Sequence, residues 1–271
     1  MYEFEHPTPV AVALQSRTGV VQLYAESRDD IQVTVEPMDG KESSREAADH
    51  TRVQLEGDTL VVEVPNADGW TLRRWPKLAI TVRVPTGSSL TGKSAAADVT
   101  ASGSWSAVKL DVASADVEIH EVTGDARLDA ASGELTVGRV GGSLSIESAS
   151  GDLRVGDVNG DVSAKSASGD VRLGAVDGRL RASTASGDVE VTRLSQGRSE
   201  VKTASGDVQV GIAAGASVWL DLSTASGRTT SGLTPQHGAA PAAEGSMLEL
   251  RVRTASGDID IQRSTRERRA A

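Results

Sequence analysis

Apolar and polar residues alternate in short runs through much of the second half of the chain. In one such run, Leu153 and Val155 stand on either side of Arg154. Alternation with a period of two is typical of a β-strand that buries one face. No run keeps a helical spacing of apolar residues over three turns. The pattern therefore predicts many short strands.

The runs recur every eighteen residues, and an acidic residue marks the same point of each copy. These acidic residues are Asp98, Asp116, Glu134, Asp152, Asp170, Asp188, Asp207 and, further along, Asp258. The spacing is eighteen residues up to Asp188 and nineteen from there to Asp207. A fixed period of this length indicates stacked repeats that bury their apolar faces against one another.

Each repeat contains two strands and two corners. Gly151-Asp152 and Asn159-Gly160-Asp161 are corner segments, because these residue types tolerate the backbone conformations of tight turns. Two strands and two corners form one coil of a single-stranded parallel β-solenoid, which is an all-β fold. The inward columns hold small and aliphatic side chains, and the chain has one Phe and two Tyr. We therefore expect a coil too thin to hold aromatic rings.

Residues 1–92 contain strand-like runs that lie outside the eighteen-residue register. These runs are 10–14, 20–24, 31–35, 52–55, 60–64 and 78–84, and the polar segment 41–50 suits a helical turn or a loop. Arg17-Thr18-Gly19 resembles the later corners. We expect residues 1–92 to form a strand-rich N-terminal cap on the solenoid of residues 93–231, because a bare end would expose unpaired strand edges.

One segment of this cap is both aromatic and basic. Trp70, Arg73, Arg74 and Trp75 fall in a stretch that is also rich in Gly and Pro. Two interpretations stay open: the segment is a partner-binding loop, or its rings plug the end of the solenoid.

The C-terminal part departs from the repeat. Residues 232–246 are rich in Pro, Gly and Ala without periodicity and predict a loop. Residues 247–262 predict closing strands at the C-terminal end, and residues 263–271 predict a disordered basic tail. Within the last repeats, Trp219 adds a large ring at a point where the coil lengthens.

Composition narrows the functional classes. The net charge of -10 makes the chain acidic and argues against a nucleic-acid partner. Without Cys there is no disulfide framework and no thiolate ligand or nucleophile. The sequence has no basic segment followed by an apolar core at its start and no run of eighteen apolar residues. We therefore expect a cytoplasmic protein without a membrane span.

The corner sequences SASGDV and NGDV, the Trp/Arg segment and the late run VWLDL carry a family resemblance. Together they resemble the bacterial β-strand-repeat family of "putative adhesins", a domain of unknown function. The resemblance covers nearly the whole chain. It implies a right-handed β-helix similar to adhesin-head domains, and it supplies no catalytic residues.

The motifs that could carry chemistry favour structural roles. The acidic column could bind Ca²⁺, but each corner offers one Gly and one carboxylate, fewer groups than the acidic β-roll turns use. Exposed carboxylates 5 Å apart repel by only about 0.8 kcal/mol in water, so the column needs no cation. The four His lie in no metal-ligand spacing, and no Gly-x-Ser-x-Gly elbow is present. We predict no catalytic, cofactor or metal site.

The sequence thus predicts a non-enzymatic interaction or scaffold module that binds a protein or a surface glycan along a sheet face. A self-assembling, cytoskeletal-type structural protein is the alternative, and a carbohydrate-active β-helix enzyme is the third. The long N-terminal segment favours a capped monomer over a filament.

Overall fold

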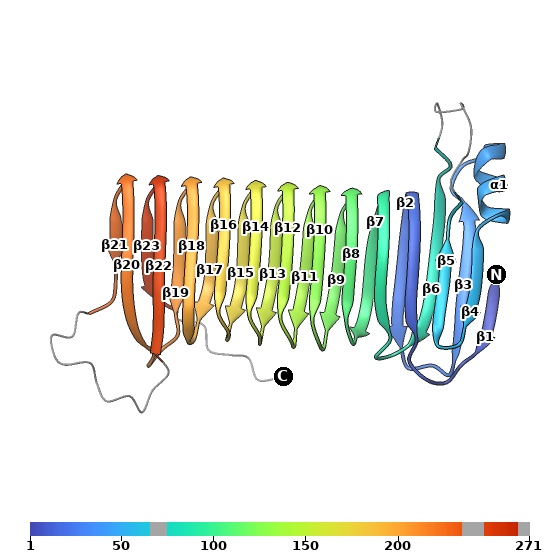
Figure 1. The fold of residues 1–271 in the computed structure, drawn as a ribbon, viewed down its shortest axis with the longest axis horizontal. Coiled ribbons are helices and arrows are strands. Elements are labelled where there is room, and N and C mark those ends of the chain that lie inside the picture. Colours follow the sequence, from blue (N-terminus) through green and yellow to red (C-terminus); the bar gives the residue numbers. More distant parts are fainter. Residues whose placement is uncertain (66–74, 235–246, 265–271) are drawn as a thin grey trace. The chain divides into compact units, whose positions relative to one another are not determined.

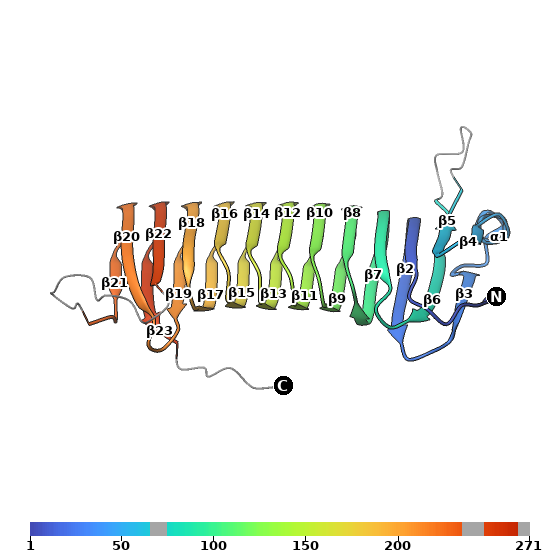
Figure 2. The same cartoon turned by 60° about the horizontal axis from the view of Figure 1, so that its bottom comes forward.

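The computed structural model describes residues 1–65, 75–234 and 247–264. Almost all regular structure is β, and parallel strands stack with an eighteen-residue offset, as in Leu153 against Val171. Figure 1 and Figure 2 show these strands side by side in two views. The predicted parallel β-solenoid is confirmed. The chain divides into unit 1, Met1–Arg139, and unit 2, Val140–Ala271.

Unit 1 begins with strands of mixed direction and one short helix. These elements are β1 (Tyr2–Glu5), β2 (Ala11–Glu26), β3 (Asp30–Pro37), α1 (Glu42–Asp49), β4 (Arg52–Glu56), β5 (Thr59–Glu63) and β6 (Leu78–Pro85). The regular coils follow as β7 (Ser89–Trp105), β8 (Val108–Ser114), β9 (Val117–Val122) and β10 (Ala126–Ser132), and β11 (Leu135–Val140) reaches the boundary.

The solenoid of unit 1 starts earlier than residue 93. Strand β2 pairs in parallel with β7 on one side and with β5 and β6 on the other. Gly19 faces Ala97 in this register, so Arg17-Thr18-Gly19 is a corner of the stack. The cap is therefore smaller than residues 1–92: β4 runs antiparallel to β5, β3 antiparallel to β6, and β1 antiparallel to β3. The insertion between β2 and β5 hides this register in the sequence.

Unit 2 repeats one coil with little change. Its strands are β12 (Leu144–Ser150), β13 (Leu153–Val158), β14 (Val162–Ser168), β15 (Val171–Val176), β16 (Leu180–Ser186), β17 (Val189–Leu194), β18 (Gly197–Ser205), β19 (Val208–Ile212), β20 (Ser217–Ser226), β21 (Thr229–Ser231), β22 (Met247–Ser256) and β23 (Ile259–Arg263). Inward residues such as Leu153, Val171 and Val189 are almost fully buried.

The last two coils of unit 2 are exchanged in order. Strand β22 pairs with β18 on one side and with β20 on the other, and β23 lies likewise between β19 and β21. The prediction that residues 247–262 close the C-terminal end was therefore wrong: they form the penultimate coil, and β20 with β21 is outermost (Figure 1). Either coil fits, because TAS at 224–226 and at 254–256 give the same corner.

Two tryptophans differ from the predicted packing. Trp219 does not fill a widened coil, because its side chain is on the outer face and 47% exposed. Trp105, at the end of β7, is fully buried and donates its indole N–H to the carbonyl oxygen of Ser102 at 3.1 Å. This coil of unit 1 therefore does hold an aromatic ring.

Most corners depend on a glycine with positive φ. At Gly133 (φ 118°) an added Cβ would lie 2.0 Å from the carbonyl oxygen of Ala115. Ala97 occupies the equivalent position on β7 without positive φ. There the Ser94 hydroxyl accepts the Ala97 N–H at 3.1 Å and donates to the Ala97 carbonyl at 2.8 Å. The Ser94 side chain thus stabilises this corner without a glycine.

Candidate binding trough in unit 1

The predicted corner column is a ladder of backbone hydrogen bonds in the structure. One carboxylate oxygen of Asp98 accepts the backbone N–H of Asp116 at 3.1 Å, and Asp170 accepts that of Asp188 at 3.0 Å. The same bond joins further coils at Glu134, Asp170, Asp207, Asp258 and Arg228 as donors. The described residues contain no cluster of three or more His, Cys, Asp or Glu side chains that could hold a metal ion.

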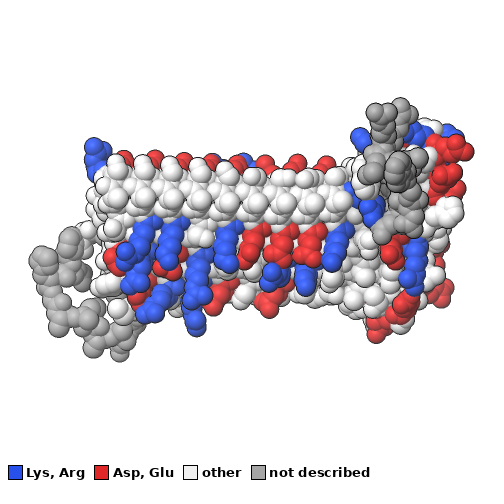
Figure 3. Space-filling model, turned by 45° about the horizontal axis from the view of Figure 1, so that its top comes forward, with Lys and Arg blue, Asp and Glu red and all other residues white. Residues whose placement is uncertain are grey.

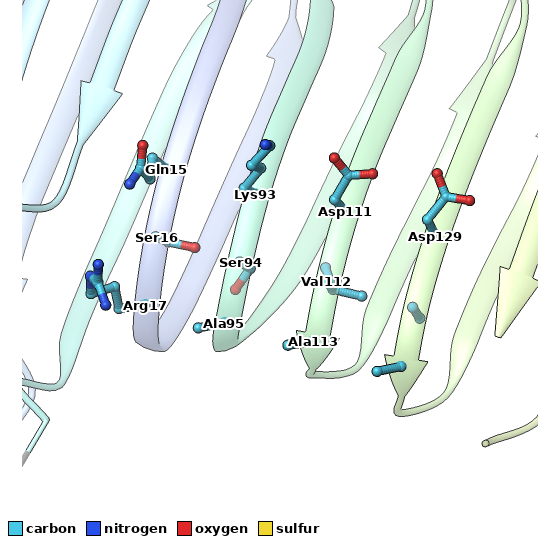
Figure 4. Close-up of a pocket in the computed structure, with 12 residues that line it drawn as sticks. Gln15, Ser16, Arg17, Lys93, Ser94, Ala95, Asp111, Val112, Ala113 and Asp129 are labelled. Atoms are coloured by element: carbon cyan, nitrogen blue, oxygen red, sulfur yellow. The ribbon is translucent and has the colours of Figure 1, made fainter. Parts of the chain in front are cut away.

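A trough of about 690 Å³ crosses four neighbouring strands of unit 1. One row of its lining consists of Gln15, Lys93, Asp111 and Asp129, and the next row consists of Arg17, Ala95, Ala113 and Ala131. Figure 4 shows the first row on successive strands, with Arg17 at the end of the second row. The three alanines form a low floor, because they are the smallest side chains that this column can carry.

The floor belongs to a wider band of small residues. Ala113 and Ser114 are both exposed, and the equivalent Ala185 and Ser186 of unit 2 are exposed as well. Figure 3 shows this uncharged band with rows of charged side chains beside it. A band of small residues is common to both units, so it does not by itself distinguish the trough.

The charges distinguish the trough from the same column of unit 2. Arg17, Lys93 and Asp111 have no ion-pair partner within 4 Å among the described residues, whereas Asp129 is paired with Arg127 at 2.9 Å. In unit 2, by contrast, Lys165 pairs with Glu147 at 2.8 Å. Lys202 also pairs there, with Glu200 at 2.7 Å, and this neighbour lowers the pKa of Glu200. Unpaired charges beside a small-residue floor are therefore a particular property of the trough.

The end of the trough is formed by an arginine and a tryptophan. The guanidinium carbon of Arg17 lies 5.3 Å from the centre of the Trp75 ring, a cation–π distance. Nε of Arg17 is buried and has no hydrogen-bond partner in the described part of the chain. Trp75 is 48% exposed, so the contact with Arg17 leaves much of the ring accessible.

The structure locates one of the four residues predicted as a partner-binding loop. Trp75 adjoins the trough through Arg17, whereas Trp70, Arg73 and Arg74 lie outside the described residues. Most of the predicted loop at 232–246 and of the predicted tail at 263–271 also lies outside them. Lys93, Asp111 and Asp129 were not predicted as site residues from the sequence. Their spacing of eighteen residues could have identified them, because it places all three side chains in one column of the repeat.

Other polar groups have local partners. Nε2 of His6 lies 3.1 Å from a carboxylate oxygen of Asp58, and Nδ1 of His50 contacts the last turn of α1. Hydrogen bonds from Lys41 and Ser44 lower the pKa of Asp39 to about 2. Within the described ranges, no helix has the length and apolar character needed to cross a membrane.

Comparisons with solved structures find similar chains at low identity. A "putative adhesin" from Bacteroides fragilis is 14% identical, with 96% of this chain and 95% of that chain covered and a TM-score of 0.48. A "putative lipid binding protein" from Parabacteroides distasonis is 11% identical, with 96% and 95% covered and a TM-score of 0.40. At this level of similarity their names say nothing about what this chain binds. No protein of curated function matches the sequence.

A family model gives a firmer result. The Toastrack model, DUF4097, matches residues 11–262, which is most of the chain. Its match begins at the start of β2 and ends within β23, the last strand in the sequence. This chain belongs to the Toastrack family, a domain of unknown function.

Proposed function

We propose that the protein is a non-enzymatic binding module that holds a short oligosaccharide in the trough of unit 1. The observation that carries the proposal is the set of unpaired charges beside the alanine floor, ending at Arg17 and Trp75. The volume of about 690 Å³ falls within the usual range of small-ligand sites, roughly 300–1,000 Å³.

The lining suits a ligand with many hydroxyl groups. Lys93 and Arg17 only donate hydrogen bonds, Asp111 and Asp129 only accept them when ionised, and Gln15 does both. A sugar hydroxyl donates one hydrogen bond and accepts others, so it can satisfy either kind of group. A peptide interface would favour large apolar anchors, and the lining contains none larger than Val112.

The Arg17 end favours an acidic sugar. Arg17 and Lys93 place two positive charges near one end of the trough. A guanidinium holds a carboxylate through paired hydrogen bonds, and the exposed face of Trp75 offers an apolar surface to a sugar ring. An acidic sugar therefore fits the positively charged end of the trough, and neutral sugars fit the uncharged floor over Ala95 and Ala113.

Binding to a panel of immobilised acidic and neutral oligosaccharides tests the proposal, followed by calorimetry of each hit. Ala113→Trp fills the floor and should weaken binding at least about tenfold, equivalent to about 1.4 kcal/mol. Ala185→Trp is the matched control, because it puts the same ring on the same column of unit 2. Arg17→Gln should weaken acidic ligands more than neutral ones.

Two results would contradict the proposal. One is that no oligosaccharide of the panel binds, whereas a protein partner binds the surface around Ala113. The other is that Ala185→Trp weakens binding as much as Ala113→Trp, which would place the sugar on the small-residue band in general.

A further inference from the structure

The outermost coil of unit 2 leaves one edge of its strands unpaired in the described part of the chain. Strand β20 is bonded to β22, and β21 is bonded to β23. Neither strand pairs with another described strand on its outer side, so a row of backbone N–H and C=O groups is available. Such an edge is a template for another strand.

The apolar interior is also open at this edge. Val218, Leu220 and Leu222 continue inward columns whose next members, on β22, are fully buried. The three side chains of β20 are only partly buried themselves. Trp219 adds a half-exposed ring on the outer face of the same strand.

The N-terminal strands of unit 1 provide an example of protected strand edges. There β4 and β1 are short strands of five and four residues, and β4 carries the ion pair between Arg52 and Glu56. Short strands and edge charges discourage pairing with another chain. Strand β20 has ten residues and one charge, Asp221, which is already paired with Arg251 and Arg253.

We propose that β20 pairs with β20 of a second copy, so that two molecules join at their C-terminal coils around a two-fold axis. An axis normal to the β20 face reverses the strand direction and the stacking direction but keeps the inward face inward. Strand β20 therefore meets its copy antiparallel, β21 meets β21, and the two open interiors become one. Because the N-terminal edges of unit 1 are protected, association stops at two copies.

The sequence of β20 selects the register. Inward residues can face inward residues only if the axis passes through a residue position, since side chains alternate. An axis at Leu220 places Leu220 opposite itself, Val218 opposite Leu222, and Trp219 opposite Asp221. An axis at Asp221 would set two carboxylates opposite each other, which is unfavourable. The register centred on Leu220 is therefore preferred.

The size of the contact predicts a weak dimer. The end coil comprises the fifteen residues 217–231. At roughly 30–40 Å² per interface residue, each copy buries about 500 Å² and the pair about 1,000 Å², near the lower limit of specific interfaces. We expect a monomer–dimer equilibrium in the micromolar range that depends on protein concentration.

Disulfide trapping tests the register, because the chain has no Cys of its own. In Leu220→Cys the two Cα atoms would lie about 4.5–5.5 Å apart across the axis, which a disulfide can span. In Ser223→Cys the two positions are six residues apart along the strands, or about 20 Å. Mild oxidation should cross-link the first variant rapidly and leave the second monomeric.

Sedimentation velocity of the unmodified chain over a wide concentration series tests the assembly itself. Monomer and dimer alone are expected. Leu220→Lys should raise the dimer dissociation constant at least about tenfold by opposing two ammonium groups. Gln209→Lys should leave it unchanged, since β19 is an interior strand and the new ammonium group would face Glu190 and Asp260. A monomer at all concentrations, growth beyond two copies, or equal cross-linking of both Cys variants overturns the proposal.

Discussion

Gly169 lies at the corner between β14 and β15, where the backbones of successive coils approach closely. Its φ is 126°, and an added Cβ would lie 2.3 Å from the carbonyl oxygen of Gly151. Gly169→Ala therefore has two costs. Positive φ costs an alanine about 1–2 kcal/mol. Separating the two coils also weakens the bonds that join them, from Gly151 N–H to the Ser168 carbonyl oxygen at 3.0 Å and from Leu153 N–H to the Asp170 carbonyl oxygen at 2.9 Å, at about 1 kcal/mol each. We expect a loss of about 3–4 kcal/mol.

Gly215→Ala is the control that separates these two costs. Gly215 also has positive φ, 78°, but no heavy atom lies within 4 Å of the added Cβ. This variant should lose only the conformational term, about 1–2 kcal/mol. Urea unfolding followed by circular dichroism measures both variants, and hydrogen exchange in residues 162–186 shows whether the loss is local to the altered coil, as expected for a stack of repeats. Equal losses in the two variants would refute the steric argument.

Three further changes test separate features. Ser94→Ala should destabilise unit 1 by about 1–3 kcal/mol in urea unfolding, because it leaves the N–H of Ala97 without its partner. The lowered pKa of Asp39, about 2 against an ordinary 3.8, means that its contacts with Lys41 and Ser44 stabilise the fold above pH 4 and lose that effect as the pH falls toward 2; Asp39→Asn should flatten the melting temperature across this window, and an unchanged slope would contradict the assignment. Millimolar Ca²⁺ should leave the melting temperature unchanged, since the corner carboxylates already accept backbone N–H groups; a rise of many degrees would show a cation site.

The repeat made the interior of the fold predictable because each coil contacts its neighbour at a constant offset. Leu153 and Val171 are both buried and paired as the eighteen-residue column requires. The ends were less predictable, because β2 and β22 pair with strands far away in sequence. Nothing in the composition of β20 and β22 decides which of them is outermost, since both carry alternating apolar residues and the same corner.

The candidate trough likewise combines residues that the repeat predicts with a residue that only the long-range strand pairing brings close. Lys93, Asp111 and Asp129 follow the repeat and could have been aligned from the sequence. Arg17 could not be added to them without knowing that Gly19 pairs with Ala97, across 78 residues. The contact between Arg17 and Trp75 depends on the same long-range pairing of β2, so local patterns do not contain it.

The position of a strand in the stack changes how each unit resists being pulled apart. A strand on the edge of a stack can be peeled away one hydrogen bond at a time, but a strand inside the stack must lose two ladders together. The strands nearest the C-terminus, β22 and β23, are held on both sides, and β2 near the N-terminus of unit 1 is held in the same way. A pulling force applied at β23 or at β2 must therefore break two ladders together, whereas a force applied at β1, which pairs only with β3 among the described strands, must break one.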